Sequence, residues 1–208
     1  MADTRYYLAL DLGAESGRAV LGAFDGLKLT LEDVHRFPNT PVRLPDGLHW
    51  DALRLLSEIK VGIAGAVQKS GGRIESLGLD TWGVDFGLLD KHGALLGNPY
   101  HYRDSRTDGM VRKACRVAPR KKIFEQTGLQ FMQINTLFQL YAMRLKASPQ
   151  LAAADCLLMM PDLFNYWLTG KKVNERTIAS TSQCLDPLRR DWAWALIKKL
   201  GLPARIFG

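Results

Sequence analysis

The feature that most constrains the fold is a short apolar segment that ends in an acidic, glycine-bearing turn. Residues 6–12, Tyr-Tyr-Leu-Ala-Leu-Asp-Leu, are typical of a strand, and Gly13-Ala-Glu-Ser-Gly17 follows at once. Two more strand candidates, 18–24 and 28–37, are separated by the reverse-turn signal Asp25-Gly26. The pattern predicts a three-stranded antiparallel meander.

A helix is predicted to follow the meander. Residues 51–69 carry Leu53, Leu56, Ile63 and Val67 at near-helical spacing, and Ser70-Gly71-Gly72 ends the pattern. The prolines at positions 38, 41 and 45 are predicted to prevent regular structure before this helix. Two short strands, 74–79 and 84–89, then frame a turn that contains Trp82 and Gly83.

The rest of the chain has mainly helical patterns. Asp104 and either Asn135 or Thr136 are expected at helix starts, and we find no further parallel strand after residue 186. The predicted helices are 104–117, 119–127, 136–147, 149–154, 161–168 and 191–200, and the predicted buried strand is 157–160. This order indicates an α/β fold, a mixed sheet with flanking helices, as in actin-like (ribonuclease H-like) sugar kinase domains.

Composition excludes several classes of protein. The 208 residues are 47% hydrophobic, which is ordinary for a globular chain, and the apolar run near the N-terminus is too short for a signal peptide or a membrane span. The three cysteines and four histidines lack metal-like or disulfide-framework spacing. We therefore expect a cytoplasmic protein with no membrane contact.

The chain has a formal net charge of +7, which is compatible with binding to a polyanion. The densest basic cluster, within residues 112–122, falls in a helical pattern and is interpreted as a solvated face. We therefore predict that the protein does not bind nucleic acid.

The chemistry predicted for residues 11–18 is phosphate and metal binding. Successive backbone N–H groups in a tight turn can converge on an anion, and the carboxylate of Asp11 at its edge can hold Mg²⁺ through the water shell of the ion. The Gly-Lys-Ser/Thr ending of a Walker A loop is missing. The alternative is that Asp11 caps a strand while Gly13 and Gly17 only turn a hairpin.

Five blocks of sequence, taken in order, carry a family resemblance. The chain resembles the rhamnulokinases, a group within the FGGY family of carbohydrate kinases, and the Asp-Thr-Trp-Gly-Val-Asp stretch is the most specific of the matches. The matching blocks are residues 9–18, 76–90, 102–107, 135–140 and 158–170.

The resemblance implies transfer of the γ-phosphate of MgATP to the 1-hydroxyl of L-rhamnulose, in a cleft between two actin-like domains. It places Asp11 near the metal. The residues that it places against the ATP phosphates are Ala14, Glu15, Ser16, Gly17 and Arg18. Glu15 departs from the family pattern, in which a small hydroxyl residue is common, and its carboxylate would repel phosphate unless it points outward or pairs with Arg18.

The sugar is expected at the turn that contains Trp82, Gly83 and Asp85. The resemblance implies that Gly83 contacts the substrate, because glycine allows a close approach to the backbone. Trp82 offers a flat apolar face to a deoxysugar, and Asp85 offers a polar group. The alternative is that Trp82 is a core aromatic residue and Asp85 a turn acid.

The catalytic base is the part of the mechanism that we do not find. In this family it is an aspartate in a His-Asp-Thr-like motif, which residues 1–208 lack. We interpret 1–208 as an incomplete N-terminal kinase domain, whose partner is a C-terminal domain of the same kinase, and expect no activity from it alone. The alternatives are a kinase for another ketose or polyol, and a non-catalytic actin-like sugar-binding module.

Overall fold

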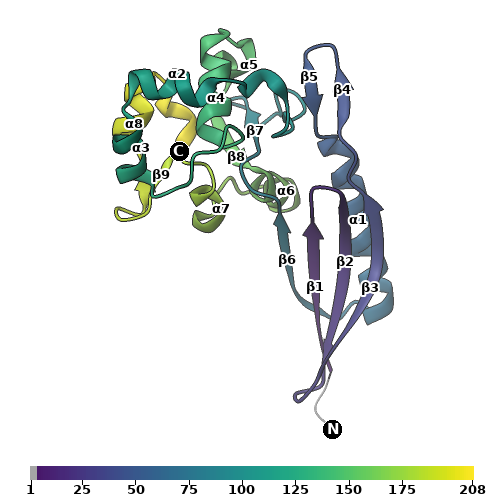
Figure 1. The fold of residues 1–208 in the computed structure, drawn as a ribbon. Helices are drawn as coiled ribbons and strands as arrows, with labels where there is room; N and C mark the ends of the chain where they lie inside the picture. Colours follow the sequence, from purple (N-terminus) through teal and green to yellow (C-terminus); the bar gives the residue numbers. More distant parts are fainter. Residues whose placement is uncertain (1–3) are drawn as a thin grey trace. The chain divides into compact units, whose positions relative to one another are not determined.

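A computed structural model describes residues 4–208, which form two compact units (Figure 1). The first unit comprises the chain up to Pro41 together with Asp51–Trp82. The second comprises Val42–Trp50 and Gly83–Gly208. Each unit is described by itself below.

The first unit is a four-stranded sheet with a helix on one face. The strands are β1 (Arg5–Leu12), β2 (Ser16–Phe24), β3 (Leu29–Pro38) and β6 (Ile74–Thr81), and their order is β3-β2-β1-β6. The first three strands pair antiparallel, which confirms the predicted meander, and β6 runs parallel to β1 after the crossover helix α1 (Ala52–Ser70). In the described part of this sheet, β6 pairs with β1 alone and forms an edge.

Helix α1 has the predicted extent but buries a different face. Asp51 caps its first turn by accepting a hydrogen bond from Arg54 N, and Gly71 ends it in a left-handed conformation. Leu53 and Val67, which were expected in the apolar stripe, are 63% and 44% exposed. The buried stripe is instead Ala52, Leu55, Ile59, Gly62 and Ala66.

Small residues explain the face that α1 buries. A Cβ atom at Gly62 would lie 2.6 Å from the Cβ of Ala19 on β2, so the helix approaches the sheet closely at this point. Leu55 and Ile59 of α1 and Leu8 and Leu10 of β1 are all buried in the core of the unit. Truncating one of these side chains to alanine would cost about 2–5 kcal/mol.

The second unit begins with a hairpin where the prolines predicted no regular structure. Strands β4 (Val42–Leu44) and β5 (Gly47–His49) pair antiparallel, so that prediction was wrong. Pro41 precedes β4 and Pro45 lies in the connecting turn, so neither proline removes a ladder hydrogen bond.

Helices make up most of the second unit, around a two-stranded antiparallel pair of β7 and β8. Its core is built on Leu137, Phe138 and Leu157, which have no exposed surface. The remaining elements are β7 (Phe86–Leu89), η1 (Ser105–Thr107), α2 (Met110–Val117), α3 (Arg120–Thr127), α4 (Thr136–Leu145), α5 (Pro149–Ala153), β8 (Cys156–Met159), α6 (Met160–Thr169), α7 (Arg176–Ser180), β9 (Leu185–Asp186), β10 (Asp191–Trp192), α8 (Trp194–Lys199) and η2 (Ala204–Phe207).

Two predicted helices are shorter than expected. The stretch 104–117 is divided into η1 and α2 because Gly109 takes a positive φ of 72°, and Asp191–Trp192 is a short strand rather than the start of α8. Asp104 does cap η1, by accepting a hydrogen bond from Arg106 N. In residues 4–208, no helix is both long and apolar enough to cross a membrane.

Candidate functional site

The predicted phosphate turn joins β1 to β2 in the first unit. Gly13 N donates to Ser16 O at 2.8 Å, which closes the turn. Asn39, next to the end of β3, makes two hydrogen bonds to this turn. Its backbone N donates to Glu15 O at 2.9 Å, and its Nδ2 donates to Gly13 O at 2.8 Å. Asn39 is buried, so the turn is held in a fixed shape by a residue that no sequence pattern had marked.

Of the two glycines at this turn, Gly17 is required by side-chain packing. Neither Gly13 nor Gly17 takes a positive φ. A Cβ atom at Gly17 would overlap the ring of Phe37, which is buried on β3. Gly17 is therefore needed by the packing of Phe37, and left-handed backbone freedom plays no part.

Charged residues form a row across the carboxyl end of β1. The ladder places Arg18 on β2 and Asp80 on β6 on either side of Asp11, and register partners face the same side of a sheet. Arg18 Nη2 lies 2.8 Å from Asp11 Oδ2, and both side chains are about half exposed. The carboxylates of Asp11 and Asp80 are the oxygen ligands that hydrated Mg²⁺ prefers, so the row fits that ion.

Glu15 is exposed at the tip of the turn. The side chain that Arg18 contacts is Asp11, through Nε at 2.9 Å as well as through Nη2. The pairing of Glu15 with Arg18, one of the two arrangements that would make Glu15 compatible with phosphate, is therefore not the contact that Arg18 makes.

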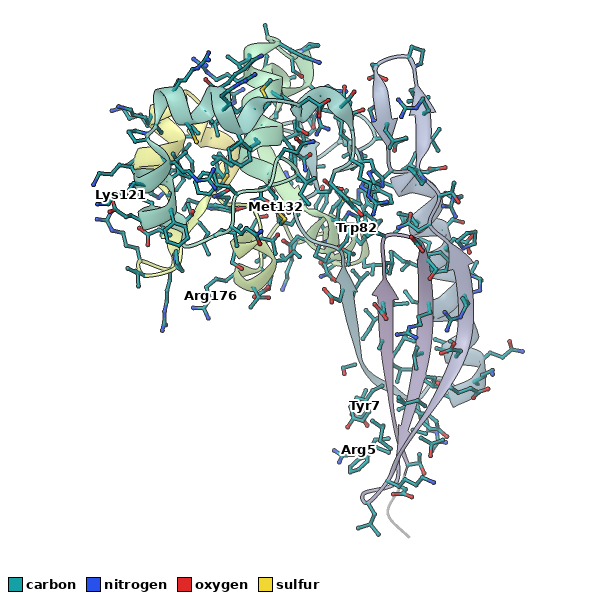
Figure 2. All side chains as sticks on the ribbon, viewed as in Figure 1. Arg5, Tyr7, Trp82, Lys121, Met132 and Arg176 are labelled. Carbon is teal, nitrogen blue, oxygen red and sulfur yellow. The ribbon has the colours of Figure 1, made fainter. Side chains whose placement is uncertain are left out.

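The predicted sugar turn, Gly83–Val84–Asp85, begins the longer chain segment of the second unit, directly after Trp82, which follows β6 and is partly buried (Figure 2). Asp85 N donates to Gly83 O at 2.9 Å, and Val84 between them has φ +68°. This combination identifies a classic γ-turn, which is rare and strained. For a β-branched residue the conformation costs about 1–3 kcal/mol and must be offset by its surroundings.

Three side chains hold the strained backbone of Val84. Thr181 Oγ1 accepts from Val84 N at 3.0 Å, while Thr136 Oγ1 and Gln139 Nε2 donate to Val84 O at 2.6 and 3.2 Å. Thr181 also fills the space beside Gly83, where a Cβ atom would lie 3.0 Å from Thr181 Oγ1. Packing against Thr181 is therefore a structural reason for glycine at this position.

Asp85 is fully buried, and its carboxylate accepts hydrogen bonds from three directions. Trp50 Nε1 donates to Oδ2 at 2.6 Å, Tyr102 N donates to the same oxygen at 3.1 Å, and Gln139 Nε2 donates to Oδ1 at 2.7 Å. Such bonds to a charged group are roughly twice as strong as neutral ones. Asp85 thus connects the γ-turn to Trp50, which follows β5, to the loop before η1 and to α4.

A buried cation completes this network. Arg106 Nη2 donates to Gln139 Oε1 at 2.5 Å, its Nη1 lies 3.7 Å from Asp104 Oδ1, and its guanidinium lies 4.1 Å from the ring of Tyr100. Burial lowers the pKa of Arg106, and the nearby carboxylates of Asp104 and Asp85 oppose that shift. The network therefore contains one buried cation, Arg106, and two buried acids, Asp104 and Asp85. Gln139 bridges Arg106 and Asp85.

The ring of Trp50, which belongs to this network, packs in a group of aromatic side chains. The ring of Trp50 stacks on His101 with 4.0 Å between centroids, and His101 packs against Tyr102. His101 Nδ1 accepts from Arg103 N at 2.9 Å, and burial followed by the charge of Arg103 lowers the pKa of His101 to about 4. A neutral His101 is thus part of the packing at neutral pH.

Several residues that shape these turns were missed from the sequence. Asp80 directly follows a predicted strand and pairs with Asp11 in the ladder, and the alignment of parallel strand ends is a signal that could have identified it. Three other residues support these turns, and no local sequence pattern marks them. They are Asn39, Trp50 and Thr181, which lie 26, 35 and 97 residues from the turn residues that they bind.

The remaining residues singled out from the sequence lie on the surface or in the core. Lys121 of the basic cluster is 85% exposed and extends from α3 (Figure 2), so this cluster has the solvated face expected of it. Phe164 is fully buried and Trp167 packs against its ring at 5.8 Å. Asn135 occupies the N-cap position of α4, but its Nδ2 donates to Gln130 O and Gln183 Oε1 instead of capping the helix.

Comparison with protein families gives a match over nearly the whole chain. Residues 6–208 match the N-terminal domain of the FGGY family of carbohydrate kinases. The chain is 42% identical over 200 residues to a rhamnulokinase of Oceanobacillus iheyensis and 43% identical over 202 residues to a rhamnulokinase of Bacteroides thetaiotaomicron. These alignments cover 96% and 97% of this chain, but 42% and 41% of the relatives, so it spans about two fifths of their length.

Solved structures share the fold at low sequence identity. A gluconate kinase and a ligand-bound xylulose kinase, both from Lactobacillus acidophilus, match with a TM-score of 0.86 and 19% identity. They cover 98% and 97% of this chain, which covers 41% of each. The glycerol kinase of Plasmodium falciparum with ADP matches with a TM-score of 0.77 and 15% identity, over 97% of this chain and 42% of its own.

These matches agree with the predicted actin-like α/β fold and with the five blocks of sequence. The chain belongs to the FGGY family of carbohydrate kinases, of which it forms the N-terminal domain.

Proposed function

We propose that this chain provides the phosphate-binding and sugar-binding turns of an ATP-dependent kinase that phosphorylates L-rhamnulose at its 1-hydroxyl. The observation that carries the proposal is the identity of 42–43% to two proteins named rhamnulokinase over at least 96% of the chain. The structural neighbours, at 19% identity or less for the three described above, support the fold and leave the sugar open.

In this proposal the turn between β1 and β2 lies against the phosphates of ATP. Its backbone, from Ala14 to Arg18, provides N–H donors, and the side chain of Arg18 provides a cation. Asp11 would hold Mg²⁺ through its water shell, with Asp80 as a second carboxylate. Bound Mg²⁺ would neutralise charge on the transferring phosphoryl group. Because Arg18 contacts Asp11, we expect this ion pair to open when phosphate takes over the guanidinium.

The sugar would lie against the γ-turn. We propose that the backbone of Gly83 and the flat face of Trp82 contact L-rhamnulose. The sugar contact predicted for Asp85 stays a prediction, and its burial supports an additional role in holding the turn. A cytoplasmic location is part of the same proposal.

A base must accept the proton of the attacking hydroxyl, and residues 1–208 contain no His-Asp-Thr motif to supply it. We therefore propose that a C-terminal domain of the same kinase completes both sites. The test is ATP-dependent phosphorylation of L-rhamnulose by the purified 208-residue chain, alone and fused at Gly208 to the C-terminal part of the Oceanobacillus iheyensis relative. We expect turnover from the fusion alone. Ordinary turnover by the isolated chain, or a preference of the fusion for xylulose or L-fuculose, would refute the proposal.

A non-catalytic sugar-binding module is the second candidate. It is favoured by one observation, that residues 1–208 lack the family base motif. A fusion that binds L-rhamnulose and shows no transfer from ATP would favour this candidate.

A further inference from the structure

We propose that Gln139 is a positioning residue that sets the shape of the γ-turn and, through it, the affinity for the sugar. The inference rests on the proposed function of Gly83–Val84–Asp85 as a sugar contact. It assigns to a buried side chain, with 1% of its surface exposed, a role in substrate recognition without contact to the substrate.

Gln139 joins the two parts of the turn that must be held together. Its Nε2 donates to Asp85 Oδ1 at 2.7 Å and to Val84 O at 3.2 Å. These acceptors belong to consecutive residues, and the φ of +68° at Val84 fixes their relative orientation. One amide group therefore binds the backbone at the strained residue and the side chain that follows it.

Only a neutral amide suits this place between a cation and an acid. Gln139 Oε1 accepts from Arg106 Nη2 while Nε2 donates to Asp85, so one side chain needs an acceptor on one side and a donor on the other. A carboxylate would place like charges 2.7 Å apart at Asp85, and an apolar side chain would leave both neighbours without this partner. The orientation of the amide is thus set by the charges on either side of it.

The position of Gln139 on α4 makes the arrangement rigid. Thr136, one turn earlier on the same helix, donates to Val84 O at 2.6 Å, and both side chains are buried. Residues three apart lie on one face of a helix, so α4 presents a pair of donors to one carbonyl. The turn is therefore fixed to a helix of the core, which favours a single shape of the backbone at Gly83.

The test compares two buried glutamines in the purified 208-residue chain. Gln139→Met removes both hydrogen-bonding groups at nearly constant volume. Gln183→Met is the matched control, because Gln183 is also fully buried and hydrogen-bonded, to Asn135 and Leu129 O, and the hydrogen bonds of its side chain do not reach the turn. The readouts are the NMR resonance of the Trp50 indole N–H, which reports on Asp85, and titration with L-rhamnulose.

We expect Gln139→Met to shift the Trp50 indole resonance and to weaken L-rhamnulose binding at least about tenfold, which corresponds to about 1.4 kcal/mol. Gln183→Met should change neither readout, even if it lowers the melting temperature as much. Equal sugar affinity in the wild type and in Gln139→Met, or equal losses in both variants, would overturn the inference. If Gln139→Met does not fold, Gln139→Leu, which also removes both hydrogen-bonding groups, replaces it with the same expected and contradicting results.

The two proposals fail in different ways. If the wild type binds xylulose or L-fuculose more tightly than L-rhamnulose while Gln139→Met alone shifts the Trp50 resonance, the proposed sugar is wrong, but the control of the turn by Gln139 stands. If the wild type binds L-rhamnulose and Gln139→Met binds it equally well, the proposed function stands and the inference is wrong.

Discussion

The indole Nε1 of Trp50 donates a hydrogen bond of 2.6 Å to Oδ2 of Asp85, and both residues are fully buried. Trp50 directly follows the hairpin of β4 and β5, whereas Asp85 ends the γ-turn. This bond connects two segments of the second unit that are 35 residues apart. An acid predicted as a sugar contact is therefore also a point at which the unit is held together.

Trp50→Phe should destabilise the protein by about 2–3 kcal/mol, because it removes a donor from a buried carboxylate and part of a buried ring. Urea unfolding measures the change. The matched control is Trp194→Phe, since Trp194 Nε1 also donates to an acid, Asp191, but its side chain is 42% exposed. We expect the control to cost less than about 1 kcal/mol. Equal losses in both variants would contradict the structural role of the Trp50 bond.

Gly17→Ala should destabilise the protein by about 1–3 kcal/mol, because its Cβ would overlap the buried ring of Phe37. Adding Phe37→Leu should recover part of that loss, so that a double-mutant cycle gives a coupling of at least about 0.5 kcal/mol. Gly78→Ala is the control, since no atom lies within 4 Å of a Cβ there and its φ is not positive. Additive effects at positions 17 and 37 would show that the clash does not exist.

Mn²⁺, a paramagnetic substitute for Mg²⁺, should broaden the NMR signals around Asp11 and Asp80 when it is added with ATP. The two carboxylates lie beside each other in the ladder and provide the oxygen ligands that such ions prefer. Asp11→Asn should reduce the broadening, whereas Asp33→Asn, at an acid paired with Arg36 on β3, should leave it unchanged. Broadening that persists in Asp11→Asn would argue against this metal site.

Asp162 predicts a dependence of stability on pH. Burial raises the pKa of Asp162 to about 7, although its carboxylate accepts a hydrogen bond from Glu175 N. The folded state therefore binds a proton between pH 4 and 7 that the unfolded state has lost, so this group lowers the free energy of unfolding as the pH rises through that window.

Asp162→Asn removes this contribution, so its stability relative to the wild type should increase from pH 4 to pH 7, by up to about 4 kcal/mol. Asp25→Asn should show no such increase between pH 4 and pH 7 and should show the opposite sign below about pH 4, because hydrogen bonds from Lys28 N and Leu27 N lower the pKa of Asp25. Urea unfolding at several pH values measures both. A difference between Asp162→Asn and the wild type that does not change with pH would contradict the prediction.

The sequence predicted well those elements that depend on local patterns. The meander of β1 to β3 and the extent of α1 follow from short apolar runs, a reverse turn and two helix caps, all of which lie within a few residues of the elements. The buried face of α1 could not be predicted in the same way. It depends on the close approach of Gly62 to Ala19, which belongs to a strand more than forty residues earlier.

The candidate site shows the same difference between features set by local sequence and features set by distant residues. The two turns that we propose to bind phosphate and sugar were singled out by sequence motifs, but the residues that support them come from distant segments. The positive φ of Val84 could not be predicted, because nothing in a valine favours that conformation. The side chains that stabilise it are Thr136, Gln139 and Thr181. These contacts exist only after the second unit has folded.

The most direct test of the central claim is an NMR titration of the 208-residue chain with L-rhamnulose, xylulose and L-fuculose. We predict saturable binding of L-rhamnulose with a Kd on the order of millimolar, tighter than for the other two sugars, with shifts at the amides of Gly83, Val84 and Asp85. Tighter binding of xylulose or L-fuculose, or L-rhamnulose shifts that leave this turn unchanged, would contradict the account.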